Sequence, residues 1–473
     1  MPSLVSRRAL LLGSTAAIAC SNRASPVDAS VDGSASDALS TDAGTGAYSI
    51  VTDNGVTWLA TPAGERTISL GVNHLEPSLW LRNYNAEASI KRYGTDFANN
   101  GKFNASGEGA KTWIEAALSN LQKWGFNALG FHSVAPENLT AGRIGIFATM
   151  RPITVTPYVP NLEYPDVFSD EVASAIDEGA RVACEKARSD SSILGYIYND
   201  RPLYNVMVGK ENVELSPWVV TLLRLDATKA GKKAWIALLQ SRYASASAAA
   251  AAHAANATTW DALASLTSWP LQALSAEAIA DHTAFLTQIV LRWYQLQHDA
   301  VRKYDPVHLI FGDKLGGGTA QSGYRGTTHP QIPAWMLPIL AKYVDVVTVE
   351  WYGYFDDQVT ALRAIHAATG KPILLGDSCF SEIQADQGGT SKGIHVDSQE
   401  AVGDAYATYL KAALAEPYII GWHFCGYIES WPVATDQFQP QNGFIDPFEV
   451  VHDAAVAKVT IANGQAVPWH KGG

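Results

Sequence analysis

Two aspartates close two similar apolar stretches of this sequence. Asp200 ends the stretch ILGYIYND (193–200), and Asp377 ends the stretch ILLGD (373–377). Two facing carboxylates can hydrolyse a glycosidic bond, because one protonates the leaving oxygen while the other attacks the anomeric carbon or activates a water molecule. A lone aspartate after a strand more often caps the next helix. The two residues are therefore a catalytic hypothesis that depends on the fold bringing them together.

Other polar and aromatic side chains also stand where apolar stretches end. Sites for small molecules combine apolar and aromatic walls with a few polar groups, which is the composition of this set. We take them as candidate substrate-binding residues: Asn199, His74, His132, Tyr158, Glu350, Trp351, Tyr352 and His423. Glu350 is the reserve carboxylate, since it ends its own apolar stretch beside Trp351.

Metal and nucleotide chemistry are less well supported. His74, His132 and His423 could converge on a metal ion, but their spacing matches no metal motif such as HExxH. The glycine-rich LGGGTAQSG (315–323) lacks the Lys-Ser/Thr pair of a phosphate loop. We therefore predict no cofactor and no metal. For Cys379 and Cys425 the sequence leaves two alternatives, a disulfide or two buried thiols.

Eight short apolar stretches bounded by turn residues predict the strands that position these groups. Helical patterns separate many of them, for example at 171–188, 284–304 and 399–415. Continuous apolar strands alternating with amphipathic helices indicate an α/β fold, and eight such units predict a (β/α)8 TIM barrel with its chemistry at the carboxyl ends of the strands. The predicted strands are 66–76, 125–133, 151–160, 193–200, 308–314, 344–354, 371–380 and 418–428.

One long segment interrupts this alternation. Residues from about 205 to 283 carry helical patterns and an alanine run at 247–252, which favours helix by propensity. We interpret the segment as a helical insertion between strands 4 and 5 of a single domain that spans 47–473.

The first 46 residues have a different composition. Residues 1–20 resemble an export signal, with a pair of arginines at Arg7 and Arg8, an apolar run, and a lipobox-like Ala-Ile-Ala before Cys20. Residues 21–46 lack large apolar side chains and predict a disordered tether. We expect an exported protein at the periplasm or cell surface, held by lipid on Cys20; ordinary cleavage near Ala19 is the alternative.

Composition and charge narrow the classes of partner. The chain is 47% hydrophobic, which is enough for a large core, and no later run of about 20 apolar residues predicts a membrane-spanning helix. Its 46 acidic and 34 basic residues give a net charge of -12, and no basic run is interleaved with aromatics. A nucleic-acid partner is therefore disfavoured.

Several segments, in the same order along the chain, resemble the beta-agarase type of clan-A (β/α)8 glycoside hydrolases. The resemblance covers about 66–455 and rests on YPDVF (164–168), GYIYND, WIALLQSRY with TTWDAL, YDPVHLIFGD, VDVVTVEWY, GKPILLGD, and GWHFCGYIESWP with QNGFID. It implies that Asp200 is the acid/base and that Asn199 hydrogen-bonds the sugar 2-hydroxyl. It also implies that Asp377 is the nucleophile, that Tyr352 supports it, and that Trp422 and His423 line the floor under the sugar.

The sequence departs from this family at both acids, because the family has glutamates where Asp200 and Asp377 stand. Each change withdraws a carboxyl by roughly 1.5 Å. Two withdrawals would widen the gap by up to ~3 Å, towards the spacing of inverting enzymes. The resemblance implies an exported glycoside hydrolase acting on a polysaccharide, such as the galactan agarose; the alternative is a catalytically silent carbohydrate-binding barrel.

Overall fold

A computed structural model describes most of the chain between residues 46 and 471. The export signal, Cys20, nearly all of the tether and Tyr158 lie outside the described residues, so the predictions on them stay predictions. The described residues are 46–76, 81–99, 102–104, 106–133, 137–150, 153, 155, 164–200, 202, 207–208, 213–214, 216–271, 274–316, 332–382, 394–431 and 442–471.

Eight parallel strands form the central sheet, in the order β7-β4-β17-β14-β13-β12-β9-β8. A bridge between Ala128 and Gly145 joins its two ends, so the sheet closes into a barrel. The predicted (β/α)8 barrel is confirmed. The strands are β4 (Ser69–Val72), β7 (Ala128–Leu129), β8 (Ile146–Thr149), β9 (Ile193–Asp200), β12 (Leu309–Gly316), β13 (Val347–Glu350), β14 (Ile373–Ser378) and β17 (Ile419–Phe424).

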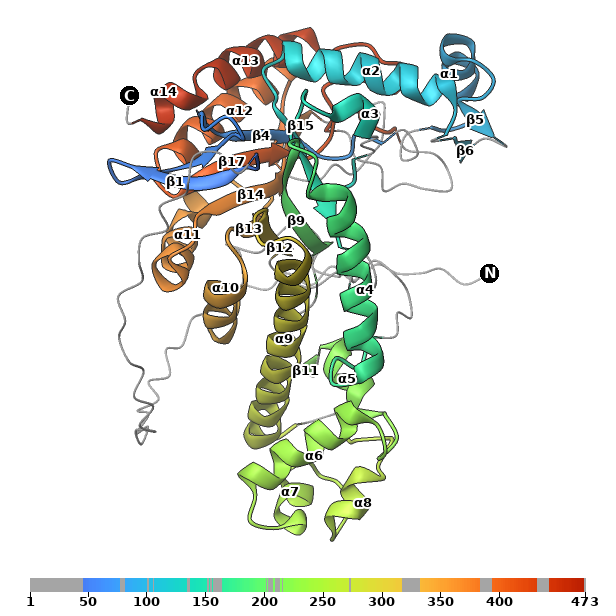
Figure 1. The fold of residues 1–473 in the computed structure, drawn as a ribbon, viewed down its shortest axis with the longest axis vertical. Helices are drawn as coiled ribbons and strands as arrows, with labels where there is room; N and C mark the ends of the chain where they lie inside the picture. The colour runs from blue at the N-terminus through green and yellow to red at the C-terminus, as the bar shows by residue number, and fades with distance from the viewer. Residues whose placement is uncertain are drawn as a thin grey trace, which may run out of the picture. The chain divides into compact units, whose positions relative to one another are not determined.

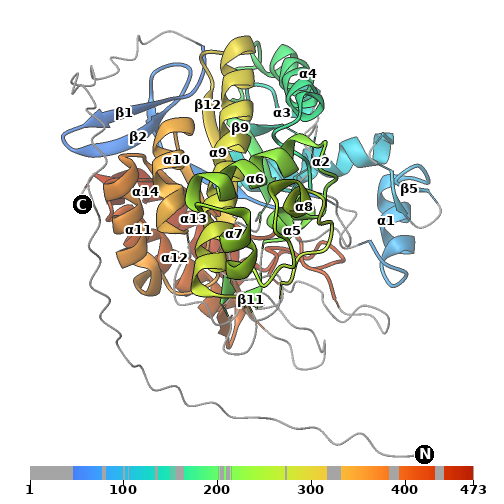
Figure 2. The ribbon, with the colours of Figure 1, turned by 90° about the horizontal axis from the view of Figure 1, so that it is seen from below.

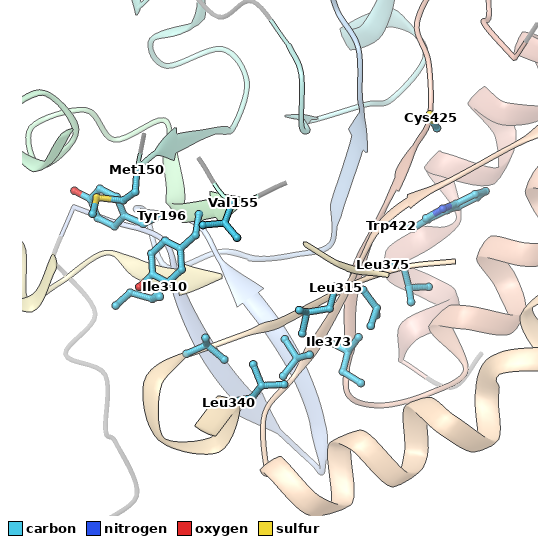
Figure 3. Packing of buried hydrophobic residues seen from close by; sticks show 14 of the residues in the cluster. Met150, Val155, Tyr196, Ile310, Leu315, Leu340, Ile373, Leu375, Trp422 and Cys425 are labelled. Atoms are coloured by element: carbon cyan, nitrogen blue, oxygen red, sulfur yellow. The ribbon is translucent and has the colours of Figure 1, made fainter. Parts of the chain in front are cut away.

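Helices cover the outside of this sheet (Figure 1). Because both faces of each strand are covered, β13, β14 and β17 are buried at every residue. Figure 3 shows part of the layer between strands and helices, with Leu315, Ile373 and Leu375 near Leu340. The covering helices are α2 (Glu108–Lys123), α3 (Glu137–Thr140), α4 (Asp170–Ala187), α9 (Ala276–Tyr304), α10 (Leu337–Tyr343), α11 (Phe355–Thr369), α12 (Gln399–Leu414) and α13 (Asp453–Gly464).

The third strand lies elsewhere than predicted. The sequence pattern placed it at 151–160, whereas β8 occupies Ile146–Thr149. The predicted segment, RPITVTPYVP, lies outside the described residues except for Ile153 and Val155, and it contains three prolines. Proline cannot donate to a strand ladder and is excluded from central strands. The preceding run IFAT has no proline, and it pairs with β9 in parallel.

A small antiparallel sheet closes the barrel at the amino-terminal ends of the strands. It consists of β1 (Ser49–Asp53), β2 (Val56–Ala60) and β3 (Arg66–Thr67). Leu59 of this sheet packs with Leu194, Leu309 and Ile420, which stand near the starts of three barrel strands. The carboxyl ends of the strands therefore form the end where a site can open.

Between β9 and β12 the chain forms four short helices, which we call the helical region (216–271). They are α5 (Pro217–Leu223), α6 (Ala230–Arg242), α7 (Ala246–Ala252) and α8 (Trp260–Ala264). Figures 1 and 2 show α6, α7 and α8 gathered together next to α9. Trp218 contacts Trp293 of α9 at 5.2 Å between ring centroids, and Trp235 contacts Phe285 at 5.2 Å.

The remaining elements are short. Among the described residues, no helix has the length and apolarity needed to cross a membrane. The short elements are α1 (Ala86–Tyr93), β5 (Ala98–Asn99), β6 (Lys102–Phe103), β10 (Met207–Val208), β11 (Val213–Glu214), η2 (Ala334–Met336), β15 (Phe380–Glu382), β16 (Ile394–Val396) and α14 (Ala466–His470).

Candidate active site

The register of four adjacent strands brings four charged residues to the mouth of the barrel. Lys314 of β12 pairs with Asp200 of β9, and Glu350 of β13 pairs with Asp377 of β14. All four stand at or near the carboxyl ends of their strands, where barrel enzymes carry their chemistry. We call these four residues the charge cluster.

Register shifts precede both pairs. One lies between Gly312 and Lys314 in β12, and another lies between Val349 and Glu350 in β13. Gly312 has φ +65°, a conformation that side chains with a Cβ rarely adopt, and an added Cβ would come within 2.9 Å of Val344. Such bulges are common next to active sites because they re-aim the side chains that follow. The bulge at Gly312 precedes Lys314, and the Lys314 side chain reaches the charge cluster.

The Lys314 ammonium is the centre of the charge cluster. Its Nζ lies 3.1 Å from Asp200 Oδ1 and 3.1 Å from Glu350 Oε2, and it donates a hydrogen bond to Asp377 Oδ2. The Lys314 side chain is only 1% exposed, and its ammonium also lies 4.8 Å from the ring centroid of Phe131. Three carboxylates around one ammonium leave a net negative charge in a buried place.

The shared ammonium limits the distance between the two candidate catalytic carboxylates. Two oxygens at hydrogen-bond distance from one nitrogen can be no more than about 6 Å apart. Retaining glycosidases hold their carboxyl groups ~5 to 5.5 Å apart, and inverting enzymes hold theirs ~6.5 to 9.5 Å apart. The predicted widening is therefore not seen between these two oxygens of Asp200 and Asp377.

Two histidines lie beside the pair. His132 Nε2 is 2.9 Å from Asp200 Oδ2, and His74 stacks on His132 with ring centroids 4.7 Å apart. Both histidines have positive φ, 55° for His74 and 60° for His132. Non-glycine residues in this conformation are uncommon and concentrate at functional sites. His74 and His132, two of the three predicted histidines, therefore lie beside the aspartate pair.

The charge cluster keeps both aspartates ionised. Burial raises the pKa of Asp200, but the Lys314 ammonium and His132 outweigh it and hold that pKa well below its usual range. Burial also raises the pKa of Asp377, while Lys314 and His74 lower it, with a net value of about 2. The three carboxylates in turn overcome the effect of burial on Lys314 and hold its pKa well above the ordinary value.

Strand β13 and the residues after it supply the remaining groups at this side of the mouth. The Trp351 N–H donates to the Asp377 carbonyl at 3.1 Å. Burial raises the pKa of Tyr352 well above its ordinary value, and the charge of Asp377 raises it further, which places Tyr352 near the candidate nucleophile. Glu350 and the Trp351 backbone therefore lie next to Asp377, and the support of Asp377 by Tyr352 stays a prediction.

Asn199 is already occupied by protein groups. Its side-chain Nδ2 donates to Asp313 Oδ1 at 3.2 Å, and its Oδ1 accepts from the Val155 N–H at 2.9 Å. The Asn199 backbone N–H also donates to Asp313 Oδ1, at 2.9 Å. Asp313 therefore anchors the end of β9 and holds Asn199 in place beside Asp200, while the predicted contact of Asn199 with a sugar stays a prediction.

The structure does not bring Trp422 to the charge cluster. Its ring lies 4.4 Å from Tyr409 and 4.6 Å from Tyr406 of α12, and its Nε1 donates to Ser378 Oγ at 2.7 Å. Side chains alternate along a strand, so His423 points to the opposite side, into the barrel. His423 is fully buried, and its Nε2 lies 2.9 Å from Ser69 Oγ. The floor role expected for Trp422 is therefore corrected to a packing role.

Two thiols also lie near the site. Cys379 and Cys425 are both buried thiols that form no disulfide, which decides between the two alternatives. Among the described residues, His74, Asp377 and Cys425 offer ligand atoms within 4.8 Å of one another. These are donors that zinc accepts. The carboxylate in this set is the one that Lys314 already holds.

Lys314 is the main residue that sequence reasoning did not assign to the site. Its signal was the glycine within the apolar run LIFGDK, because an isolated glycine in a strand marks a bulge. The two charged residues after that bulge divide their tasks: Asp313 anchors Asn199, and Lys314 enters the charge cluster.

Comparisons with known proteins define what this fold resembles. No protein family model matches the chain, and no curated protein matches it. Solved structures do. An exo-beta-agarase superposes with a TM-score of 0.70 at 18% identity, covering 91% of this chain. An agarase, AgWH50C, gives 0.69 at 17% identity and covers 90% of this chain, and BpGH50 gives 0.61 at 14% identity with 90% of this chain and 83% of that one.

This likeness shows the fold of the chain. The chain spans 66% of the length of the first two of these structures. The barrel with its charge cluster is therefore an agarase-like barrel in its fold, and its chemistry has to be argued from the site.

Proposed function

We propose that the protein is an exported glycoside hydrolase that cleaves O-glycosidic bonds of a polysaccharide. The observation that carries the proposal is the convergence of Asp200 and Asp377 on one buried ammonium at the mouth of the barrel. Two carboxylates at this spacing are the minimum machinery for glycoside hydrolysis. The fold shared with structures described as agarases supports the same reaction class.

In the proposed reaction, Asp200 is the acid/base and Asp377 is the nucleophile. Asp377 attacks the anomeric carbon while Asp200 donates its proton to the glycosidic oxygen, and the bond between that carbon and that oxygen breaks. Asp200 then takes a proton from a water molecule, whose oxygen displaces the Asp377 ester and regenerates the free carboxylate. The limit of about 6 Å on the distance between the shared oxygens supports this double displacement over direct attack by water.

The other residues have positioning and binding roles in this proposal. Tyr352 and Glu350 set the electrostatic environment of Asp377, and His132 orients the Asp200 carboxylate. His74 and Trp351 border the same carboxylates. Tyr158 is proposed to contact sugar, although it lies outside the described residues.

We propose a galactan such as agarose as the substrate, by analogy with the structures named above. The test is release of reducing sugar from a panel of neutral and charged polysaccharides, with product sizing by chromatography. Release from agarose supports the full proposal, and release from another polymer keeps the reaction but changes the substrate. Binding without release from any polymer would replace the hydrolase by a carbohydrate-binding barrel.

The location of the protein is proposed from residues 1–46. Replacing Cys20 by Ser should shift the protein from the membrane fraction to the soluble exported fraction, because the lipid would have no thiol to attach to. Unchanged membrane association of that variant would contradict the anchor. Replacing Arg7 and Arg8 by Lys should block export if the twin-arginine route is used.

A further inference from the structure

The ammonium of Lys314 joins the two candidate catalytic carboxylates. Its Nζ is within hydrogen-bonding reach of both Asp200 and Asp377. In a double displacement, one carboxyl group must donate a proton while the other must stay ionised. One ammonium bound to both carboxylates favours the ionised form of both.

The ammonium also sets a proton state that is wrong for catalysis. A general acid must carry a proton at the start of the reaction. Lys314 and His132 together hold the pKa of Asp200 well below its usual range, against the effect of burial, so Asp200 is ionised at neutral pH. The sugar-free site therefore lacks its general acid.

Besides Asp200, Lys314 has two carboxylate partners, Glu350 and Asp377. Neither of them has to be protonated in the proposed reaction. An ammonium has three hydrogens, and here three carboxylates surround it. The Asp200 side chain is 14% exposed and lies at the open edge, whereas Glu350 is 2% exposed and Asp377 is 3% exposed. Releasing Asp200 alone would leave two buried ion pairs in place.

We propose that Lys314 is a positioning residue that withdraws from Asp200, but not from Asp377 or Glu350, when a sugar enters the site. The inference rests on the proposed function. Once the ammonium has moved, Asp200 loses its nearest positive charge while the sugar desolvates it further, and it takes up a proton from solvent. Asp377 keeps the ammonium and stays ionised. Lys314 contacts both aspartates in the sugar-free site. Its withdrawal from Asp200 alone would raise the pKa of Asp200 and leave that of Asp377 low.

Other titratable groups surround the same carboxylates from neighbouring strands. They contribute to the charges around Asp200 and Asp377 before and after the lysine moves. They are His132 after β7, His74 after β4, His423 of β17, Tyr352 after β13, Cys379 after β14 and Cys425 after β17. Burial lowers the pKa of His423 to about 3, so this histidine is neutral at pH 7.

Titration calorimetry tests the inference by counting protons. An agarose-derived hexasaccharide is titrated into the full exported domain at pH 7 in two buffers with different ionisation enthalpies. We expect uptake of about one proton per sugar bound, because Asp200 passes from ionised to protonated. In Lys314→Met the uptake should fall below about half a proton, because Asp200 no longer has the ammonium that kept it ionised.

Two further variants make the result specific. Lys314→Gln removes the charge but keeps hydrogen-bond donors, and it should behave like Lys314→Met; it replaces that variant if the latter does not fold. Lys232→Met removes another buried ammonium, which donates to the carbonyls of Leu223 and Leu266, and it should keep the wild-type proton uptake.

The pH dependence of hydrolysis gives an independent readout. The kcat/KM profile reports the free protein, and the kcat profile reports the complex. In the wild type, kcat/KM should fall with rising pH at a lower pH than kcat does, since Asp200 holds its proton only in the complex. In Lys314→Met, kcat/KM and kcat should fall at about the same pH.

The outcomes separate this inference from the proposed function. Cleavage without proton uptake keeps the hydrolase and overturns the role of Lys314. Proton uptake that depends on Lys314 without cleavage keeps that role and overturns the hydrolase. A hexasaccharide that neither binds nor is cleaved counts against the galactan site and against this inference together.

Discussion

Two buried lysines, one at the barrel mouth and one in the helical region, have opposite surroundings. Lys314 is encircled by the carboxylates of Asp200, Glu350 and Asp377. Lys232 donates to two backbone carbonyls and lies 5.8 Å from the ring centroid of Trp269. Both lysines are essentially inaccessible to solvent. Two lysines of equal burial therefore differ in their neighbours. Lys314 is surrounded by charged groups, and Lys232 by neutral ones.

The two surroundings shift the lysine pKa in opposite directions. Burial lowers the pKa of Lys232 to about 8, and Asp226 only partly opposes this. At Lys314 the three carboxylates outweigh burial and raise the pKa well above its ordinary value. Burial alone favours the neutral form of a base, so only nearby opposite charge can reverse the shift.

The carboxylates of the two regions differ in the same way. Asp281 in α9 serves the helical region, and it has His253 Nε2 at 2.9 Å, Tyr243 Oη at 2.6 Å and Arg242 Nε at 2.5 Å. Several donors thus serve one acid there, whereas three acids share one ammonium at the barrel mouth. Buried acids whose pKa is shifted by a specific charge partner are candidates for a functional site, and Asp200 and Asp377 at the mouth meet that description.

The largest expected effect is on turnover. Asp200→Asn and Asp377→Asn should each lower kcat by about 1,000-fold or more, because each removes a group that changes charge in the transition state. The matched control is Asp281→Asn, which should lose stability but keep kcat in the folded fraction. Near wild-type turnover in either barrel variant would overturn the assignment of the pair.

The second expected effect is on stability. At pH 7, Lys314→Met should cost about 3 to 5 kcal/mol of unfolding free energy, since it leaves buried carboxylates without their counter-charge. Lys232→Met should cost only about 1 to 3 kcal/mol, the cost of leaving carbonyls unsatisfied. Denaturant unfolding measures both. The difference should shrink near pH 4, where the barrel carboxylates of the Lys314 variant can protonate; equal losses at both pH values would contradict the comparison.

Acid should destabilise the protein through two buried histidines, His282 of α9 and His423 of β17. Burial and His253 lower the pKa of His282 to about 3, and burial lowers the pKa of His423 to about 3, so both oppose folding increasingly as pH falls from 6.5 towards 3. Asp377, with a pKa of about 2, begins to lose its stabilising charge only below pH ~4. Hydrogen exchange at pH 4.5 should therefore show protection lost around both α9 and β17.

The control for this effect is His282→Leu, which removes the titrating group. Between pH 6.5 and 4.5, α9 of this variant should lose less protection than α9 of the wild type, where His282 costs up to about 3 kcal/mol of unfolding free energy. Equal loss of protection in the variant and in the wild type would contradict this role of His282.

The smallest expected effect is at Glu350. Glu350→Gln keeps a polar group beside Lys314 and should lower kcat by about tenfold or less, because Asp377 retains the ammonium. Steady-state measurement of kcat for Glu350→Gln and for Asp377→Asn, under the same conditions, tests this. A severe loss at Glu350 together with tolerance at Asp377 would transfer the nucleophile role to Glu350.

The barrel and most of its strands could be predicted from the sequence. Local patterns carried the information: apolar runs of four to eight residues, separated by helical periods, predicted seven of the eight strands close to where they lie. The third failed because RPITVTPYVP has strand-like residues and also prolines, and the prolines decide against a central strand. Asp200 and Asp377 could be found because each ends such a run.

The side-chain directions at the site could not be predicted in this way. Trp422 and His423 are adjacent in sequence, and only the packing of α12 decides that the tryptophan points outward and the histidine inward. Asn199 resembles a sugar-binding residue in sequence, but Asp313 and Val155 take its amide. Neighbours distant in sequence decided both cases.

The sequence by itself determined an eight-stranded barrel, two carboxylates at its mouth and a segment of helices between the fourth and fifth strands. Only the tertiary structure decided that these carboxylates share one ammonium with Glu350. That contact depends on the bulge at Gly312 and on the register of β12 with β9, more than 100 residues away, and with the nearer strands β13 and β14. These strands are continuous apolar runs, so their sequences contain no alternation that would specify the register.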